Sequence, residues 1–130
     1  MKKVVQENSM GCGVACTASI LDKSYSETLT LFKNGEIRAK TVGFSCRSIV
    51  DVLKREGLNY KRKSAKDPNE TFPPDSIVFI DYSAKYPFGH FFAKASAGWM
   101  DPWINIHKHP RVAGFRQELP GKPIYLIYKA

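Results

Sequence analysis

The pattern of apolar and polar positions divides this chain into a helical first half and a strand-rich second half. Apolar residues recur at helical spacing in three stretches, which are residues 12–21, residues 26–32 and the segment between Ser45 and Gly57. The first stretch is apolar on nearly every side, which predicts a buried central helix. We expect Ser24 or Ser26 to cap the second helix, with an end near Asn34-Gly35. Ser45 is expected to cap the third helix.

The second half contains short β-prone runs that are separated by turn residues. The expected strands cover residues 60–64, 77–80, 89–94, 99–103 and 124–128. Three prolines make residues 67–74 a loop. Helices followed along the chain by an antiparallel sheet give an α+β fold class. We expect one domain over residues 1–130, with a helical part over about 1–57 and a sheet part over about 58–130.

Composition excludes several classes of protein. The chain is 43% hydrophobic and 12% aromatic, which is ordinary for a globular protein with a packed core. No apolar stretch approaches the roughly 20 residues that span a bilayer. Lys2 and Lys3 are not followed by the apolar segment of a signal peptide. Three cysteines, an odd number, argue against a disulfide-stapled secreted scaffold, so we expect a cytoplasmic protein.

The net charge of +8 favours acidic peptides or polyanions as partners. The densest basic cluster is Lys61-Arg62-Lys63 with Lys66, and a looser one lies between residues 107 and 116. Sites for single-stranded nucleic acid interleave aromatic residues with basic ones, and only Tyr60 lies beside the first cluster. A solvated basic strand is therefore favoured over a nucleic-acid site.

The run Gly11-Cys12-Gly13 at the start of the first helix is the main candidate for chemistry. A helix N-terminus favours thiolate over thiol, because unpaired N–H groups and partial positive charge gather there. The flanking glycines would let a substrate backbone approach closely. Gln6, six residues earlier, carries a side-chain amide that can donate to an oxyanion. We interpret Cys12 as a catalytic cysteine.

A cysteine hydrolase also needs a histidine to hold the proton and an acceptor to orient that histidine. His90 follows Gly89 at the start of a predicted strand, where its ring can stand clear at a sheet edge. Asp101 lies on the next strand, so its carboxylate is expected beside the imidazole and would fix its tautomer. Cys12, His90 and Asp101 form a coherent triad, with Gln6 and the Cys12 N–H as oxyanion donors.

Ordinary structural explanations exist for each of these residues taken alone. A cysteine in a buried helix is usually a small core residue, a description that fits Cys16 and Cys46 better than Cys12. An Asp-Pro pair such as Asp101-Pro102 commonly makes a turn. The combination, order and spacing of the residues favour catalysis.

Substrate contacts are expected from Gly11, Gly89 and Trp99, although Trp99 also suits packing under the His90 strand. His107 and His109 lie on one side of an extended stretch and resemble half of a zinc site. No cysteine or carboxylate pair is suitably spaced to complete it, so no metal and no cofactor is expected.

These motifs resemble those of the papain-like cysteine peptidases that process bacteriocin precursors, cutting leader peptides after a double glycine. In that family a Gln is followed six residues later by Cys-Gly-x-Ala, which Gln6 and Cys12-Gly13-Val14-Ala15 match. Gly89-His90-Phe91-Phe92 and Trp99-Met100-Asp101-Pro102 match the second and third motifs. The resemblance implies a papain-like fold as a stand-alone domain. It also implies Cys12 as nucleophile, His90 as general base and acid, Asp101 as its orienting partner and Gln6 as oxyanion donor.

The reaction we expect is hydrolysis of an amide in a peptide or protein through a thioester acyl-enzyme. The same triad would also serve an acyltransferase or a deamidase, because only the acceptor or the amide differs. A catalytically idle peptide-binding domain and a nucleic-acid-binding domain are the remaining alternatives.

Overall fold

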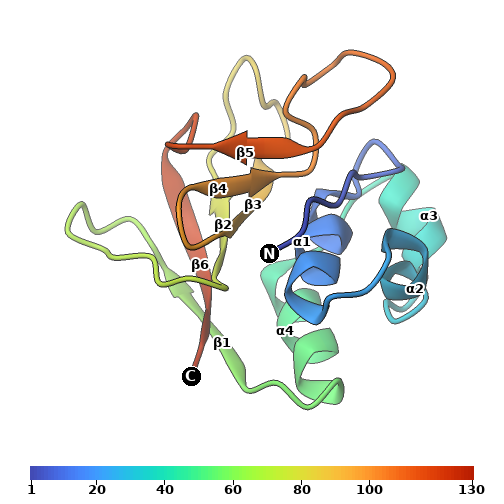
Figure 1. Cartoon of the computed structure of the whole chain (residues 1–130), viewed down its shortest axis with the longest axis horizontal. Coiled ribbons are helices and arrows are strands. Elements are labelled where there is room, and N and C mark those ends of the chain that lie inside the picture. Colours follow the sequence, from blue (N-terminus) through green and yellow to red (C-terminus); the bar gives the residue numbers. More distant parts are fainter.

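Four helices lie on one side of a six-stranded antiparallel sheet in the computed structural model of residues 1–130 (Figure 1). The helices are α1 (Cys12–Leu21), α2 (Tyr25–Leu29), α3 (Gly35–Lys40) and α4 (Cys46–Arg55). The strands are β1 (Tyr60–Ser64), β2 (Ile77–Ile80), β3 (His90–Lys94), β4 (Trp99–Asp101), β5 (Gly114–Arg116) and β6 (Pro123–Lys129). Their order across the sheet is β1-β6-β2-β3-β4-β5. The predicted α+β class, with helices first, is confirmed.

Helix α1 is the central helix of the fold, as its apolar pattern predicts. Its residues from Gly13 to Ser19 are all buried, and it packs against β3 as well as against α2 and α4. The Thr17 hydroxyl donates to the Gly13 carbonyl at 2.7 Å, so this polar side chain is satisfied inside the core. The packing on β3 brings the N-terminal end of α1, with Cys12, beside the start of that strand.

The sheet has a hydrophobic cluster on each face. Phe91 and Ala93 of β3 belong to the larger cluster beneath the helices, and Phe92 belongs to the smaller cluster on the other face. Both faces of β3 are therefore covered, which explains why apolar residues run almost without interruption along this strand. None of the helices is long and apolar enough to cross a membrane.

Two short elements were not predicted, and the first is α3. Asn34-Gly35 marks the beginning of α3 rather than the end of a longer helix over 26–32. Asn34 adopts the left-handed conformation with φ 54°, and a Cβ on Gly35 would collide with the Leu29 carbonyl. Helix α2 is correspondingly short. Ser24 caps it in a reciprocal box with Glu27, in which the Glu27 amide donates to Ser24 Oγ at 3.0 Å.

The second unpredicted element is β5, a three-residue strand that pairs with β4. Its register places Arg116 opposite Trp99 and Gly114 opposite Asp101. Strand β4 ends at Asp101, so the predicted strand over 99–103 is two residues too long. At the opposite edge of the sheet, β1 exposes four of its five residues and buries only Tyr60.

Candidate active site

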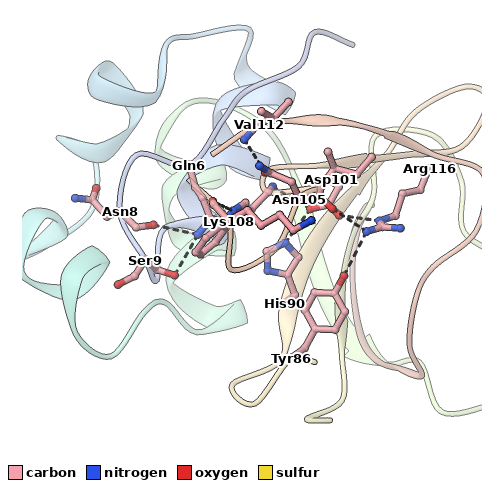
Figure 2. Close-up of polar contacts among 12 residues, drawn as sticks. Gln6, Asn8, Ser9, Tyr86, His90, Asp101, Asn105, Lys108, Val112 and Arg116 are labelled. Carbon is pink, nitrogen blue, oxygen red and sulfur yellow. Dashed lines mark hydrogen bonds and ion pairs between the residues drawn. The ribbon is translucent and has the colours of Figure 1, made fainter. Parts of the chain in front are cut away.

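The three residues of the expected triad lie together at the ends of three elements. Cys12 is the first residue of α1, His90 is the first residue of β3, and Asp101 is the last residue of β4. His90 Nε2 lies 2.9 Å from Asp101 Oδ1 (Figure 2). Because Asp101 occupies Nε2, the other ring nitrogen, Nδ1, is left to face the Cys12 thiol. The interaction between the two groups lowers the pKa of the Cys12 thiol and raises the pKa of His90.

The environment of Cys12 favours the thiolate. Burial raises the pKa of its thiol, but the charge of His90, a hydrogen bond to its ring and the backbone amides of Phe91 and Gly13 lower it, and the net direction is downward. The Cys12 backbone N–H has no hydrogen-bond acceptor in the protein, as expected for the first turn of a helix. A partly exposed thiol with a lowered pKa therefore lies beside a free backbone donor.

The other two cysteines have the opposite tendency, as expected for structural thiols. Burial raises the pKa of Cys16 well above its ordinary value, and the nearby Cys12 and Asp101 charges raise it further. Burial also raises the pKa of Cys46, to about 11. Of the three cysteines, only Cys12 has a lowered pKa.

His90 is held in its protonated form. Its side chain is almost completely buried, which lowers its pKa, but the Cys12 thiolate and the hydrogen bond to Asp101 outweigh burial and raise the pKa to about 9. An imidazolium between a thiolate and a carboxylate is the resting state that this arrangement favours near neutral pH.

Asp101 is fully buried and accepts three hydrogen bonds. Oδ1 accepts from His90 and from the Trp103 backbone amide at 3.0 Å, and Oδ2 accepts from Arg116 Nε at 2.8 Å. Burial raises the pKa of this carboxyl, but the hydrogen bond and charge of His90 and the bond from Arg116 give a net lowering. The carboxylate is therefore ionised and fixed in orientation.

Arg116 and Tyr86 belong to this site, although no sequence pattern singles out either residue. Arg116 lies at the end of the loose basic stretch between residues 107 and 116. The Tyr86 ring lies against His90, with ring centroids 5.3 Å apart. Arg116 Nη2 approaches the Tyr86 hydroxyl at 3.5 Å (Figure 2). The register of β5 would have been needed to find Arg116.

Gln6 lies beside the site but is not free to donate into it in this structure. Its side chain is buried, and Nε2 donates to the carbonyls of Asn8 and Ser9 at 3.0 and 3.1 Å (Figure 2). Its Oε1 has no partner. The Gln6 backbone amide donates to the Pro102 carbonyl at 3.2 Å, which ties the N-terminal segment to the end of β4. Gln6 thus fixes the turn that leads to Cys12.

Of the three expected substrate contacts, Gly89 lies in the cleft beside His90. It has φ +71°, and a Cβ there would collide with the Phe79 ring. Gly11 is buried away from the cleft lining, and the space of its missing side chain is filled by the Tyr25 hydroxyl. Trp99 is buried in the smaller hydrophobic cluster, where the Lys94 ammonium lies 5.5 Å from its ring. Packing therefore accounts for Gly11 and Trp99.

Cys12 and His90 open into a cleft of about 410 Å³. Its rim carries large apolar side chains that remain exposed, which are Val42, Tyr82 and Phe88. Lys40 and Lys85 also line it, so the cleft is apolar with a positive rim. His107 reaches the same cleft, and its Nε2 lies 2.7 Å from the Lys85 carbonyl. No cluster of three or more metal-ligating side chains is present.

No protein-family model and no curated protein matches this sequence. Among solved structures, the chain is similar to the peptidase domain of Streptococcus ComA, a bi-functional ABC transporter involved in a quorum-sensing pathway. The TM-score is 0.60 at 19% sequence identity, and the match covers 99% of this chain and 97% of the other. The chain therefore has the fold of a papain-like peptidase domain, which confirms the predicted fold and supports the resemblance that its motifs indicate.

Proposed function

We propose that this chain is a cysteine peptidase that hydrolyses a peptide amide bond through a thioester acyl-enzyme. The observation that carries the proposal is the placement of Cys12 and His90 in one cleft, with Asp101 bonded to His90, the Cys12 pKa lowered and the His90 pKa raised. Opposite shifts in two adjacent groups are typical of a catalytic pair. The residues 1–130 act as one domain in this proposal, with α1 and the sheet each supplying part of the site.

In the first half-reaction, the Cys12 thiolate attacks the scissile carbonyl carbon and forms a C–S bond. The His90 imidazolium gives its proton to the leaving amine as the C–N bond breaks, which leaves a thioester and a neutral imidazole. In the second half-reaction, His90 takes a proton from water as the water oxygen attacks the thioester carbon. The C–S bond then breaks, the acid product is released, and the Cys12 thiolate and His90 imidazolium are regenerated.

The oxyanion of each tetrahedral intermediate needs hydrogen-bond donors. The free Cys12 N–H supplies one, since it has no acceptor within the protein. Gln6 supplies the second in our proposal, and this requires one of its N–H groups to turn from the Asn8 or Ser9 carbonyl toward the substrate. One such donor is worth about 10²- to 10³-fold in kcat in a serine hydrolase with a comparable oxyanion hole.

The proposed substrate is a peptide or protein segment in extended form. The exposed apolar rim suits apolar side chains, and the two lysines at the rim favour acidic ones. The sequence motifs and the ComA-like fold make leader-peptide processing the first specific activity to test. Three free cysteines suit a reducing compartment, and we propose a cytoplasmic location on that ground.

The decisive experiment compares turnover of a peptide library by the native chain, Cys12→Ala and Cys16→Ser. Cleavage is expected to disappear in Cys12→Ala and to stay within a few fold in Cys16→Ser, because the Cys16 thiol is buried and not ionised. Product masses separate hydrolysis from acyl transfer or side-chain deamidation. Binding of peptides without any Cys12-dependent product would instead indicate an idle binding domain and overturn the peptidase proposal.

A further inference from the structure

The Asp101 carboxylate has two cationic partners, and the triad uses only one of them. Oδ1 accepts from His90, whereas Oδ2 accepts from Arg116 Nε at 2.8 Å. A buried carboxylate with His90 as its only cationic partner would be costly to ionise. Arg116 thus neutralises the group that orients the general acid, from a strand that contributes nothing else to the triad.

Arg116 is held in place by the fold at several points. Its Nη2 donates to the Ile104 carbonyl at 3.2 Å, so a second hydrogen bond fixes the guanidinium beside Asp101. Gly98, with φ +100°, leaves room for the Arg116 carbonyl, which a Cβ at that position would strike. The side chain is 23% exposed, so solvent screens its charge only in part. A side chain with this many fixed contacts is preorganised rather than mobile.

Arg116 also contacts the residue that shields His90. Tyr86 is 2% exposed, and its ring is tilted by 35° against the imidazole. Its hydroxyl lies 3.5 Å from Arg116 Nη2. The guanidinium therefore contacts both the carboxylate that bonds His90 and the hydroxyl of the tyrosine that covers His90 (Figure 2).

Charges of alternating sign run through the site from α1 to β5. They are the Cys12 thiolate, the His90 imidazolium, the Asp101 carboxylate and the Arg116 guanidinium. Without the last of these, the buried carboxylate would hold the His90 proton more tightly. A tightly held proton is a poor proton for a leaving amine, because general acid catalysis works best when the pKa lies near the working pH.

We propose that Arg116 is a positioning residue that acts through Asp101 to limit the proton affinity of His90 and to fix its ring for proton transfer. This inference rests on the proposed peptidase function. Other titratable groups lie near His90 and its partners, and they set the background against which Arg116 acts. They are Cys12 and Cys16 of α1, Tyr86 before β3, and His107, which lines the same cleft.

The first test measures the His90 pKa by NMR in Cys12→Ser, where neither turnover nor the thiolate enters. Arg116→Gln in this background is expected to shift the His90 titration to higher pH, because a positive charge is lost. Arg116→Lys is expected to restore the titration, because it keeps the charge. An unchanged titration in a folded Arg116→Gln protein, or no restoration by lysine, overturns the proposal.

A matched control removes a cation of equal charge elsewhere. Arg55 lies at the end of α4 and donates to the Leu31 carbonyl, so Arg55→Gln is expected to leave the His90 titration unchanged. A shift of equal size in Arg55→Gln would show a general charge effect and overturn the specific role of Arg116.

A second measurement needs no change at Arg116 and decides the case if Arg116→Gln does not fold. In Cys12→Ser, the Arg116 Nε–H resonance is expected to move as His90 titrates, because both groups bond the same carboxylate. Asp101→Asn should weaken this response. An Arg116 Nε–H resonance that does not shift as His90 titrates overturns the proposal.

In the otherwise native chain, Arg116→Gln is expected to lower kcat by about 10- to 100-fold with little change in KM, as for a displaced catalytic group. Both limbs of the pH profile should move to higher pH. An unchanged pH profile would contradict the proposed tuning. If no peptide is cleaved by any form, the NMR results still decide the role of Arg116 separately from the proposed function.

Discussion

Replacement of His90 by alanine tests the core of the proposed site, because the reactivity of Cys12 depends on that histidine. Burial alone raises the pKa of the Cys12 thiol, and His90 supplies the largest contributions that lower it. His90→Ala removes these contributions and leaves burial in place. We therefore expect the Cys12 pKa to rise above that of an ordinary thiol, and its alkylation by iodoacetamide to become slow near neutral pH.

The size of the effect can be worked out by comparison with an ordinary thiol. A thiol with the ordinary pKa of about 8.5 is roughly 3% ionised at pH 7 and roughly 0.3% at pH 6. Complete ionisation of Cys12 would raise the thiolate fraction by at most about 30-fold and 300-fold at these two values. A less basic thiolate is also a weaker nucleophile, which offsets about half of the gain on a logarithmic scale. We expect His90→Ala to slow alkylation at pH 6 by about tenfold or more.

The assay follows alkylation of each cysteine by peptide mass spectrometry between pH 5 and pH 9. The native rate at Cys12 should be high well below the ordinary thiol pKa of about 8.5. It should change again near pH 9, as His90 loses its proton. His109→Ala is the matched control, because His109 is exposed and its ring lies beside that of Trp103, with centroids 5.6 Å apart. An identical Cys12 profile in native protein and His90→Ala would refute the thiolate–imidazolium pair.

Three further changes probe the rest of the site. Asp101→Asn is expected to lower kcat by at least about tenfold, and by less than the about 10⁴-fold known for a serine triad, because the thiolate is already formed; full activity in a protein folded by circular dichroism would remove its orienting role. Gln6→Ala should lower kcat by about 10²-fold at unchanged KM if Gln6 donates to the oxyanion, and a loss below threefold would limit it to holding the Asn8–Ser9 turn. Gly89→Ala should destabilise the fold by more than the cost of placing alanine in the left-handed conformation, which is about 1–2 kcal/mol, because the added Cβ collides with the Phe79 ring. Gly57→Ala is the control that measures the backbone cost alone, since Gly57 has φ +87° and open space around it. Equal melting temperatures for the two variants would contradict this packing.

Sequence patterns located the long elements because their physical determinants are local. The apolar run after Cys12 and the Ser45 cap each act within a few residues, and the structure has α1 and α4 where these features predict them. Helix α3 escaped prediction because Asn34-Gly35 is equally suited to end a helix or to begin one. The deciding contact is the approach of Gly35 to the Leu29 carbonyl, which depends on the folded chain.

The candidate site shows the same division. Cys12, His90 and Asp101 could be selected because each lies in a predicted element and in a short motif of neighbouring residues. Arg116 could not, since its partner is set by the pairing of a three-residue strand with β4. The expected roles of Gly11 and Trp99 depended on which way each residue faces, and burial against tertiary neighbours decides that.

The exposed basic strand β1 has a consequence for how copies of this protein meet. It forms an open edge of the sheet, with unpaired backbone groups that would otherwise template pairing with another chain. Lys61, Arg62 and Lys63 are all exposed on this strand. Two copies aligned along this edge would bring these cations face to face, and repulsion would oppose strand addition. The basic cluster Lys61-Arg62-Lys63 thus opposes edge-to-edge aggregation of the sheet.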